Sequence, residues 1–265
     1  RQGNVSGGES HIISLVKHID RIRLEPVVLA FTDGQMIDDL KNSGIESFVI
    51  PSEKAFDFSK WKQVKTLMQE EQIDLVQIHG TMATSNIYWA AKNLHLPVIY
   101  TIHGWSFHDD QSSLVKKARI FFEKWITQKT DCNISVSASN QKTGFDNISN
   151  FKSTVIYNGI DLEKFNPENI ERKNLRAQLN IPADAIVISF IGRITLQKDP
   201  LSLIKAFKEV VAVQPKAVLL MVGDVDMKEE TIKLAKELKI ADKIIFENFR
   251  TDVADILFSS DVYCL

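Results

Sequence analysis

The chain has little of what marks several specialised classes of protein. Among its 265 residues there are only two cysteines, Cys132 and Cys264, which is too few for a disulfide framework and typical of a reducing compartment. No apolar run approaches the length of a membrane span, and we expect no signal peptide. The formal net charge is -2, which argues against a nucleic-acid-binding protein that needs a broad cationic face. We therefore expect a cytoplasmic protein that does not bind nucleic acid.

What the chain contains is the composition of an ordinary globular protein. Hydrophobic residues make up 44% of it and charged residues 25%, which is enough to build a sizeable core. Its length is compatible with two domains or one large one. The N-terminus opens directly into a glycine-rich segment with no strand ahead of it, and residues 261–265 stop inside an expected strand. We therefore expect a piece of a longer protein, truncated at both ends.

Strand and helix patterns alternate along two stretches of the chain. In the first stretch we expect strands at 26–32, 47–50, 75–78, 97–102, 132–136 and 153–157. In the second stretch the strands fall at 185–191, 217–222, 243–246 and from 261 onward, separated by helices at 200–213, 228–238 and 252–258. Alternation of this kind predicts right-handed βαβ crossovers and parallel sheets.

The strand pattern lapses between the two stretches, at 162–182. This segment has many charges, the pair Asn166 and Pro167, and one short helix near Leu175, so it reads as a linker. We therefore predict the α/β class, with two tandem Rossmann-like, doubly wound domains that face a cleft. The predicted domains are residues 1–165 and an incomplete second domain, residues 166–265.

A short strand-to-helix connection in the second stretch carries two cations. The apolar strand at 185–191 is followed by Asp199, a natural N-cap, and Pro200, a natural first helical residue. Arg193 and Lys198 thus lie at the carboxyl edge of a sheet, where open α/β sheets bind their ligands. A planar guanidinium and a point charge suit a diphosphate. The alternative is a pair of solvated surface cations.

Histidines follow two expected strands of the first stretch. His79 and His103 end strands that could be neighbours; Thr81 and Ser85 follow in the loop after His79, and His108 lies close by. A zinc site would use such residues, but their spacing matches no compact metal motif, so we expect no metal.

Two further segments read locally as caps and turns. Residues 6–9, Ser-Gly-Gly-Glu, have the spacing of a capping box ahead of an amphipathic helix. Asn158 and Gly159 read as a tight turn, with Asp161 as a cap for the segment that follows.

Four segments in this order resemble the glycosyltransferases of the GT-B fold, specifically the large retaining family 4. They are SGGESHI (6–12), VIYTIHG (98–104), VIYNGIDLEKFNP (155–167) and FIGRITLQKDP (190–200), with weaker matches in LLMVGD (219–224) and FENFRTDVADILFSSDVYCL (246–265). The resemblance implies transfer of a sugar from a UDP- or GDP-sugar to a saccharide or lipid-linked acceptor. It further implies retention of the anomeric configuration, no metal or other cofactor, and a role in assembling cell-surface polysaccharide or glycolipid.

The resemblance also implies roles for particular residues. Arg193 and Lys198 would clamp the donor diphosphate and stabilise the leaving group, while His103 would orient the hydroxyls of the transferred sugar rather than act as a base. The donor side would comprise Gly7, Gly8, Gly192, Arg193, Lys198, Gly223, Asp224, Phe249 and Arg250. The acceptor side would comprise Glu9, His79, Thr81 and Asn158. The family's glutamate-rich donor segment would come after Leu265.

The expected helix 114–127 is basic and amphipathic. It carries Lys116, Lys117 and Lys124 beside apolar and aromatic residues, a composition that can lie on an anionic membrane surface. Family members with lipid-linked acceptors dock in a comparable way, at the inner face of the membrane. The alternative is a helix that packs on its own sheet and leaves a solvated basic edge.

Two other functions fit the same architecture. A nucleotide-sugar 2-epimerase would need acidic and histidine residues around a buried sugar, and the spacing of Arg193 and Lys198 argues against it. A non-catalytic module that binds nucleotide sugars is the second alternative. A Rossmann dehydrogenase is disfavoured because no G-x-G-x-x-G follows a predicted strand.

Overall fold

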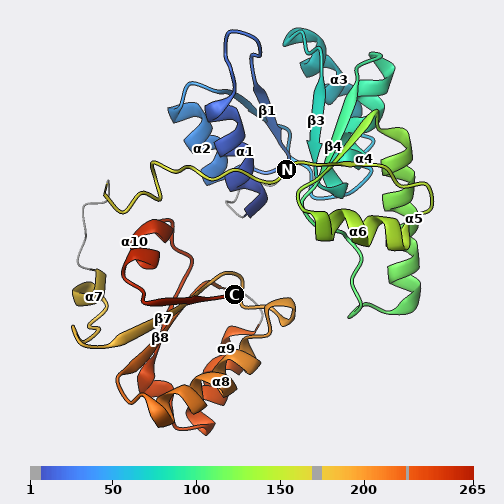
Figure 1. Ribbon diagram of the computed structural model, residues 1–265. Helices are drawn as coiled ribbons and strands as arrows, with labels where there is room; N and C mark the ends of the chain where they lie inside the picture. The colour runs from blue at the N-terminus through green and yellow to red at the C-terminus, as the bar shows by residue number, and fades with distance from the viewer. Residues whose placement is uncertain (1–6, 169–174, 225–226) are drawn as a thin grey trace. The chain divides into compact units, whose positions relative to one another are not determined.

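A computed structural model describes residues 7–168, 175–224 and 227–265. The chain forms two compact units, Arg1–Ile160 and Asp161–Leu265, here called unit 1 and unit 2 (Figure 1). In both units the paired strands run parallel and helices connect them, so the predicted α/β class is confirmed. Ser6, the first residue of the expected capping box, lies outside the described residues.

The strands of unit 1 form two parallel sheets. The smaller sheet pairs β1 (Val27–Ala30) with β2 (Glu46–Val49). The larger one has the order β3-β4-β5-β6, formed by Val76–His79, Val98–Ile102, Cys132–Ser135 and Thr154–Val155. Within it, His79 at the end of β3 is in register with Thr101 of β4. The carboxyl ends of these two central strands therefore lie side by side.

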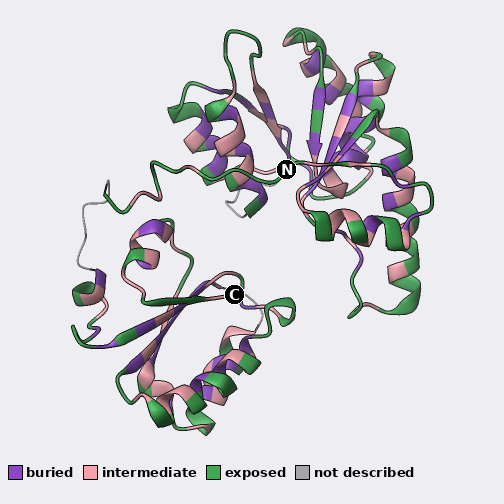
Figure 2. Cartoon of the chain, viewed as in Figure 1, coloured by how far each residue is buried: buried purple, intermediate pink, exposed green. Residues whose placement is uncertain are grey.

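Six helices accompany these strands in the described part of unit 1. They are α1 (Gly7–His18), α2 (Gln35–Asn42), α3 (Trp61–Glu70), α4 (Thr81–Asn93), α5 (Ser113–Lys129) and α6 (Ala138–Asn147). Figure 2 shows the buried residues of unit 1 gathered along its strands, and much of α5 exposed. Tyr100 and Ile102 of β4 are almost fully buried. Burying a side chain of this size stabilises the fold by about 1.5–3 kcal/mol, so the strand that leads to His103 is firmly held.

Two helices of unit 1 begin ahead of their apolar periodicity. The glycine-rich segment at the N-terminus includes Gly7 and Gly8, which form the first turn of α1, where Gly8 is buried. Thr81 and Ser85 were expected to line a loop, but α4 begins at Thr81 and includes both of them. In each case the helix starts earlier than its apolar periodicity, because the first turn needs no apolar face of its own.

Unit 2 is built on one parallel sheet with the order β10-β7-β8-β9. Its strands are Ile186–Ile191 (β7), Ala217–Val222 (β8), Ile244–Glu247 (β9) and Val262–Cys264 (β10). The chain proceeds outward from β7 to β9 and then returns to the other side of β7 with β10. The strand order therefore reverses between β7 and β10, and such a switch point is where open α/β sheets bind ligands.

The helices of unit 2 are α7 (Leu175–Gln178), α8 (Pro200–Val213), α9 (Lys228–Glu237) and α10 (Val253–Phe258), with 3₁₀ turns at Leu196–Lys198 and Ala241–Lys243. Of these, α8 and α9 begin at the predicted residues, and α10 begins one residue later than predicted. Pro200 is the first residue of α8, and the Asp199 side chain accepts the Ser202 N–H at 3.3 Å, so both predictions are confirmed. Asp252 directly precedes α10, but its carboxylate makes no capping hydrogen bond and binds Arg250 instead.

The segment between the two sheets has mostly irregular structure. The Asp161 carboxylate accepts the Lys164 N–H at 3.0 Å, which confirms the predicted cap. The tight turn expected at Asn158 and Gly159 is wrong, because these residues continue as irregular chain after β6. The short helix near Leu175 is α7.

The two units use the same contact to join neighbouring strands. Asp131 directly precedes β5, and its carboxylate and main-chain N–H bind the N–H and C=O of Val98 in β4 at 2.8 and 2.9 Å. Asp261 directly precedes β10, and it binds Val187 of β7 in the same way, at 2.7 and 2.8 Å. Each carboxylate therefore fixes the start of one parallel strand to the next.

Candidate active-site residues in the two units

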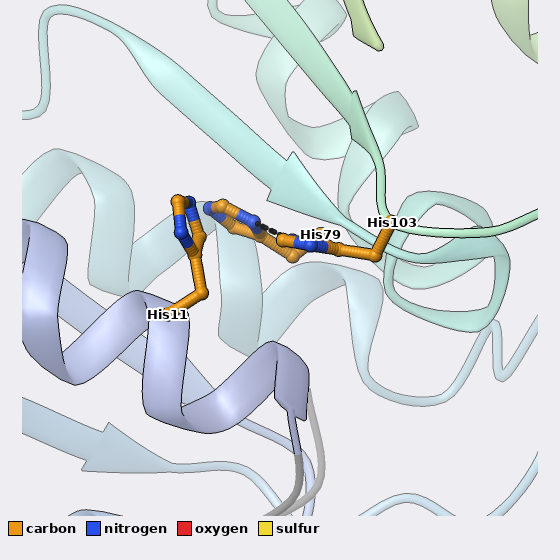
Figure 3. Close-up of side chains that lie close together, drawn as sticks. All are labelled: His11, His79 and His103. Carbon is orange, nitrogen blue, oxygen red and sulfur yellow. Dashed lines mark hydrogen bonds between the residues drawn. The ribbon is translucent and has the colours of Figure 1, made fainter. Parts of the chain in front are cut away.

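Three histidines of unit 1 lie together at the carboxyl edge of its larger sheet (Figure 3). His79 ends β3 and His103 follows β4, and their Nδ1 and Nε2 atoms are 2.8 Å apart. His11 reaches them from α1, with ring centroids 5.8 Å from His79 and 5.0 Å from His103. The prediction that the strands ending in His79 and His103 are neighbours is confirmed.

His11 is a member of this cluster that we did not single out from the sequence. A signal for it existed, since His11 lies four residues after Gly7 and three after Gly8, and therefore on the same face of a helix. Burial lowers the pKa of His11 below its ordinary value, which favours the neutral form of its ring. The expected neighbour His108 does not belong to the cluster found among the described residues. The next residue, Asp109, forms an ion pair with Lys116 at 2.6 Å.

The other residues expected on the acceptor side occupy different surroundings. Glu9 is 2% exposed in the first turn of α1. The Thr81 hydroxyl donates a hydrogen bond to the buried carboxylate of Glu123 at 2.9 Å, so this hydroxyl already has a hydrogen-bond partner within unit 1. Asn158 is exposed after β6. Their roles towards an acceptor stay predictions.

A cavity of about 310 Å³ opens between α4, α5 and the loops beside them. Its lining is mostly apolar, and it includes Phe56, Met82, Phe122, Trp125, Thr81 and Arg119. Glu123, fully buried next to Thr81, also accepts hydrogen bonds from the Tyr100 hydroxyl at 3.1 Å and the Ser106 N–H at 3.3 Å. These hydrogen bonds stabilise the buried carboxylate. No sequence pattern marked this cavity, because its residues come from segments far apart in the chain.

In unit 2, the glycines at the ends of β7 and β8 bring two loops into close contact. Gly192 N–H donates to Val222 O at 3.0 Å, and Ile194 N–H donates to Asp224 O at 3.2 Å. Gly223 has a φ of 147°, and a Cβ placed on it would lie 1.9 Å from Gly192 O. Only glycine fits at this position.

Arg193 and Lys198 extend from the loop that these contacts hold. Both side chains are exposed, and neither forms an ion pair within the described ranges 7–168, 175–224 and 227–265. Arg193 follows β7 at the switch point of the sheet, and Lys198 ends the 3₁₀ turn just before α8. Two cations at such an edge are available to an anionic ligand.

Asp224, Phe249 and Arg250 form a second set of contacts at this edge of unit 2. The Asp224 carboxylate accepts the Phe249 N–H at 2.8 Å, and mainly for this reason its pKa lies below its ordinary value. Arg250 binds Asp252 and Glu247 at 2.6 and 3.0 Å, which raises the pKa of its guanidinium. The Arg250 side chain and the Phe249 N–H thus have partners within the unit, and the place of these two residues on the donor side stays a prediction.

Family models match almost the whole chain. The model of Glycosyltransferase Family 4 matches residues 5–164, and that of Glycosyl transferases group 1 matches residues 171–265. None of the helices in the described ranges has the length and hydropathy needed to cross a membrane.

Curated relatives and solved structures agree with these matches. The chain is 26% identical over 245 residues to the UDP-Gal:alpha-D-GlcNAc-diphosphoundecaprenol alpha-1,3-galactosyltransferase of Escherichia coli, covering 88% of this chain and 62% of the relative. It is 24% identical over 229 residues to the putative glycosyltransferase EpsD of Bacillus subtilis, covering 82% and 60%. The chain thus spans about three fifths of the length of these relatives.

Solved structures share the fold. Anabaena HepE in complex with UDP and glucose superposes with a TM-score of 0.81 at 20% identity, covering 98% of this chain and 71% of HepE. WaaG, a glycosyltransferase involved in lipopolysaccharide biosynthesis, has a TM-score of 0.71 at 13% identity, covering 99% and 73%. With parallel sheets in both units and family matches along both, the chain belongs to glycosyltransferase family 4 and has the GT-B fold.

Proposed function

We propose that this protein transfers a sugar from a UDP-sugar to an acceptor hydroxyl during assembly of a cell-surface polysaccharide or glycolipid. The observation that carries the proposal is the pair of exposed cations, Arg193 and Lys198, on a rigid loop at the switch point of unit 2. The planar guanidinium of Arg193 and the compact ammonium charge of Lys198 suit the two phosphates of a nucleoside diphosphate. The UDP complex of HepE and the UDP-sugar named for the Escherichia coli relative support UDP as the nucleotide.

The two cations would act on the leaving group. As the bond between the sugar and the diphosphate breaks, negative charge develops on the departing phosphate oxygens, and fixed positive charges stabilise it. We propose that this clamp does the work for which other transferases use a divalent ion, and that the anomeric configuration is retained. On the unit 1 side, His103 would orient the hydroxyls of the transferred sugar.

The surface of α5 supports a contact with an anionic membrane, where lipid-linked acceptors reside. Leu114 is 80% exposed and Phe121 is 65% exposed, and Lys117 and Arg119 lie on the same helix. Exposed apolar side chains next to cations are typical of helices that lie at a membrane surface. The diphosphoundecaprenol-linked sugar in the name of the Escherichia coli relative is consistent with an acceptor held there. The cytoplasmic location stays a prediction.

Activity with defined donors tests the proposal. The full-length protein is incubated with UDP-glucose, UDP-galactose, UDP-N-acetylglucosamine and GDP-mannose, with and without EDTA and a membrane extract as acceptor source. We expect release of UDP from one of these donors, resistance to EDTA, and a product whose anomeric configuration matches that of the donor by NMR. Formation of a 2-epimer without transfer would support an epimerase. Nucleotide binding without turnover would support a non-catalytic module.

A further inference from the structure

We propose that His11, His79 and His103 form a binding site for a divalent transition metal such as Zn²⁺, and that a metal bound there inhibits sugar transfer. The binding itself follows from the geometry of unit 1. The inhibition rests in addition on the function proposed above.

The three rings offer one nitrogen each within a small volume. One nitrogen from each ring lies within 4.8 Å of the other two. His79 Nδ1 and His103 Nε2 form a hydrogen bond of 2.8 Å, which a metal ion bound by either atom would replace. A tetrahedral zinc ion with Zn–N distances of 2.0–2.1 Å holds its nitrogens about 3.3–3.4 Å apart. Movements of about 1.5 Å or less, within reach of side-chain rotation, would therefore bring the three nitrogens to bonding distance.

The elements that carry the rings hold them in place. His79 and His103 extend from adjacent parallel strands whose residues Ile78 and Ile102 are almost fully buried, and His11 extends from α1 opposite them (Figure 3). A site on strand ends and a helix needs little ordering when the metal binds, which favours affinity.

The donor set selects the class of metal. Imidazole nitrogens suit Zn²⁺, Cu²⁺ and Ni²⁺, whereas Mg²⁺ and Ca²⁺ prefer oxygen ligands. Three protein ligands also leave a fourth position open to water or another molecule. The expectation of no metal relied on close spacing in the sequence, but here the fold brings together residues at positions 11, 79 and 103.

A metal at this site would compete with the sugar for His103. The nitrogen that coordinates the ion is no longer available to orient a sugar hydroxyl, and the ion adds positive charge where none is needed for transfer. We therefore expect inhibition that a chelator reverses, rather than activation. This is also how the site differs from a catalytic metal, since the proposed transfer proceeds in EDTA.

Metal binding is tested first, without any activity measurement. Co²⁺ is added to the metal-free protein and followed by its visible absorption, and Zn²⁺ is titrated by calorimetry. His79→Ala and His11→Ala should each weaken binding by more than about 100-fold, because losing a ligand costs more than the 10–100-fold typical of losing an outer-shell partner. His18→Ala is the matched control, since His18 is an exposed histidine of the same helix. It should bind like the wild type.

The outcomes separate the two parts of the proposal. Wild-type metal affinity in His79→Ala and in His79→Gln, with unchanged circular dichroism, would overturn the site. A variant that fails to fold is replaced by the His11 variant, which tests the same site from another element. Zn²⁺ should inhibit UDP release by the wild type, and the activity that remains in His11→Ala should resist Zn²⁺. Binding without inhibition would overturn the regulatory part, and an absence of transfer with any donor would count against the proposed function but not against metal binding.

Discussion

Arg193 and Lys198 show how a main chain can be fixed while its side chains stay available. The loop that carries them is hydrogen-bonded to the carboxyl end of β8 and leads directly into α8. Both cations are nevertheless exposed and form no ion pair with a carboxylate in the described ranges. A ligand that meets them must order two side chains but not the loop, which lowers the cost of binding.

Removing either cation should weaken nucleotide binding. We expect Arg193→Ala and Lys198→Ala each to raise the Kd for UDP by about 10–100-fold, because a hydrogen bond to a charged group contributes about 1.5–3 kcal/mol. Isothermal titration calorimetry measures this directly. Lys205→Ala is the control, since Lys205 is an exposed cation of α8, beyond the loop. Unchanged UDP affinity in both test variants would rule out the clamp.

At the scale of elements, the sequence predicts the helices and strands well and their first turns less well. The start of α8 at Pro200 follows from proline's fixed φ, and no tertiary contact is needed to predict it. In contrast, the first turns of α1 and α4, which begin at Gly7 and Thr81, lie ahead of the apolar pattern of each helix. The same limit applies to His11 and to the cavity beside Glu123, which depend on packing between distant segments.

The contact between the ends of β7 and β8 should not tolerate a side chain. Gly223→Ala forces a left-handed φ on alanine and places its Cβ against Gly192 O. Backbone strain alone costs about 1–3 kcal/mol. We expect urea unfolding of unit 2 to occur at a clearly lower midpoint, and UDP binding to weaken as the loop shifts. Gly159→Ala, where the added Cβ meets nothing within 4 Å, should behave like the wild type. Equal midpoints for the two variants would contradict this account.

The exposed apolar residues of α5 should decide whether the protein binds membranes. Replacing Leu114 and Phe121 with serine should reduce cosedimentation with phosphatidylglycerol vesicles by more than about tenfold, since burying each side chain contributes about 1.5–3 kcal/mol. Val213→Ser is the control, because Val213 is 84% exposed but ends α8 in unit 2. If the double variant sediments like the wild type, α5 is not the contact.

At the scale of the whole molecule, the two units share a weakness towards acid. The pKa of Asp131 is lowered by its hydrogen bond with Lys92 and by the Val98 N–H. The pKa of Asp261 is lowered by the Val187 N–H and by Arg176. A carboxylate whose pKa is lower in the folded state stabilises the fold above its unfolded pKa, near 3.8, and this contribution is lost as the pH falls through the folded value.

We therefore expect both units to lose stability between about pH 5 and pH 2. Urea unfolding at several pH values measures the loss. Asp131→Asn and Asp261→Asn should be less stable than the wild type at pH 7 and should depend less on pH in this window, because their amides do not titrate. Asp74→Asn, at an exposed position of unit 1, is the matched control. A wild-type pH dependence in both test variants would contradict the role given to these carboxylates.

The bonds around Gly192 have a consequence for how this loop can change in evolution. Gly192 N–H and Ile194 N–H are bonded to Val222 and Asp224, and Ile194 O accepts the N–H of Met227. An inserted residue would pull at least one of these groups out of register. This connection should therefore tolerate exchange of its exposed side chains more readily than any change in its length.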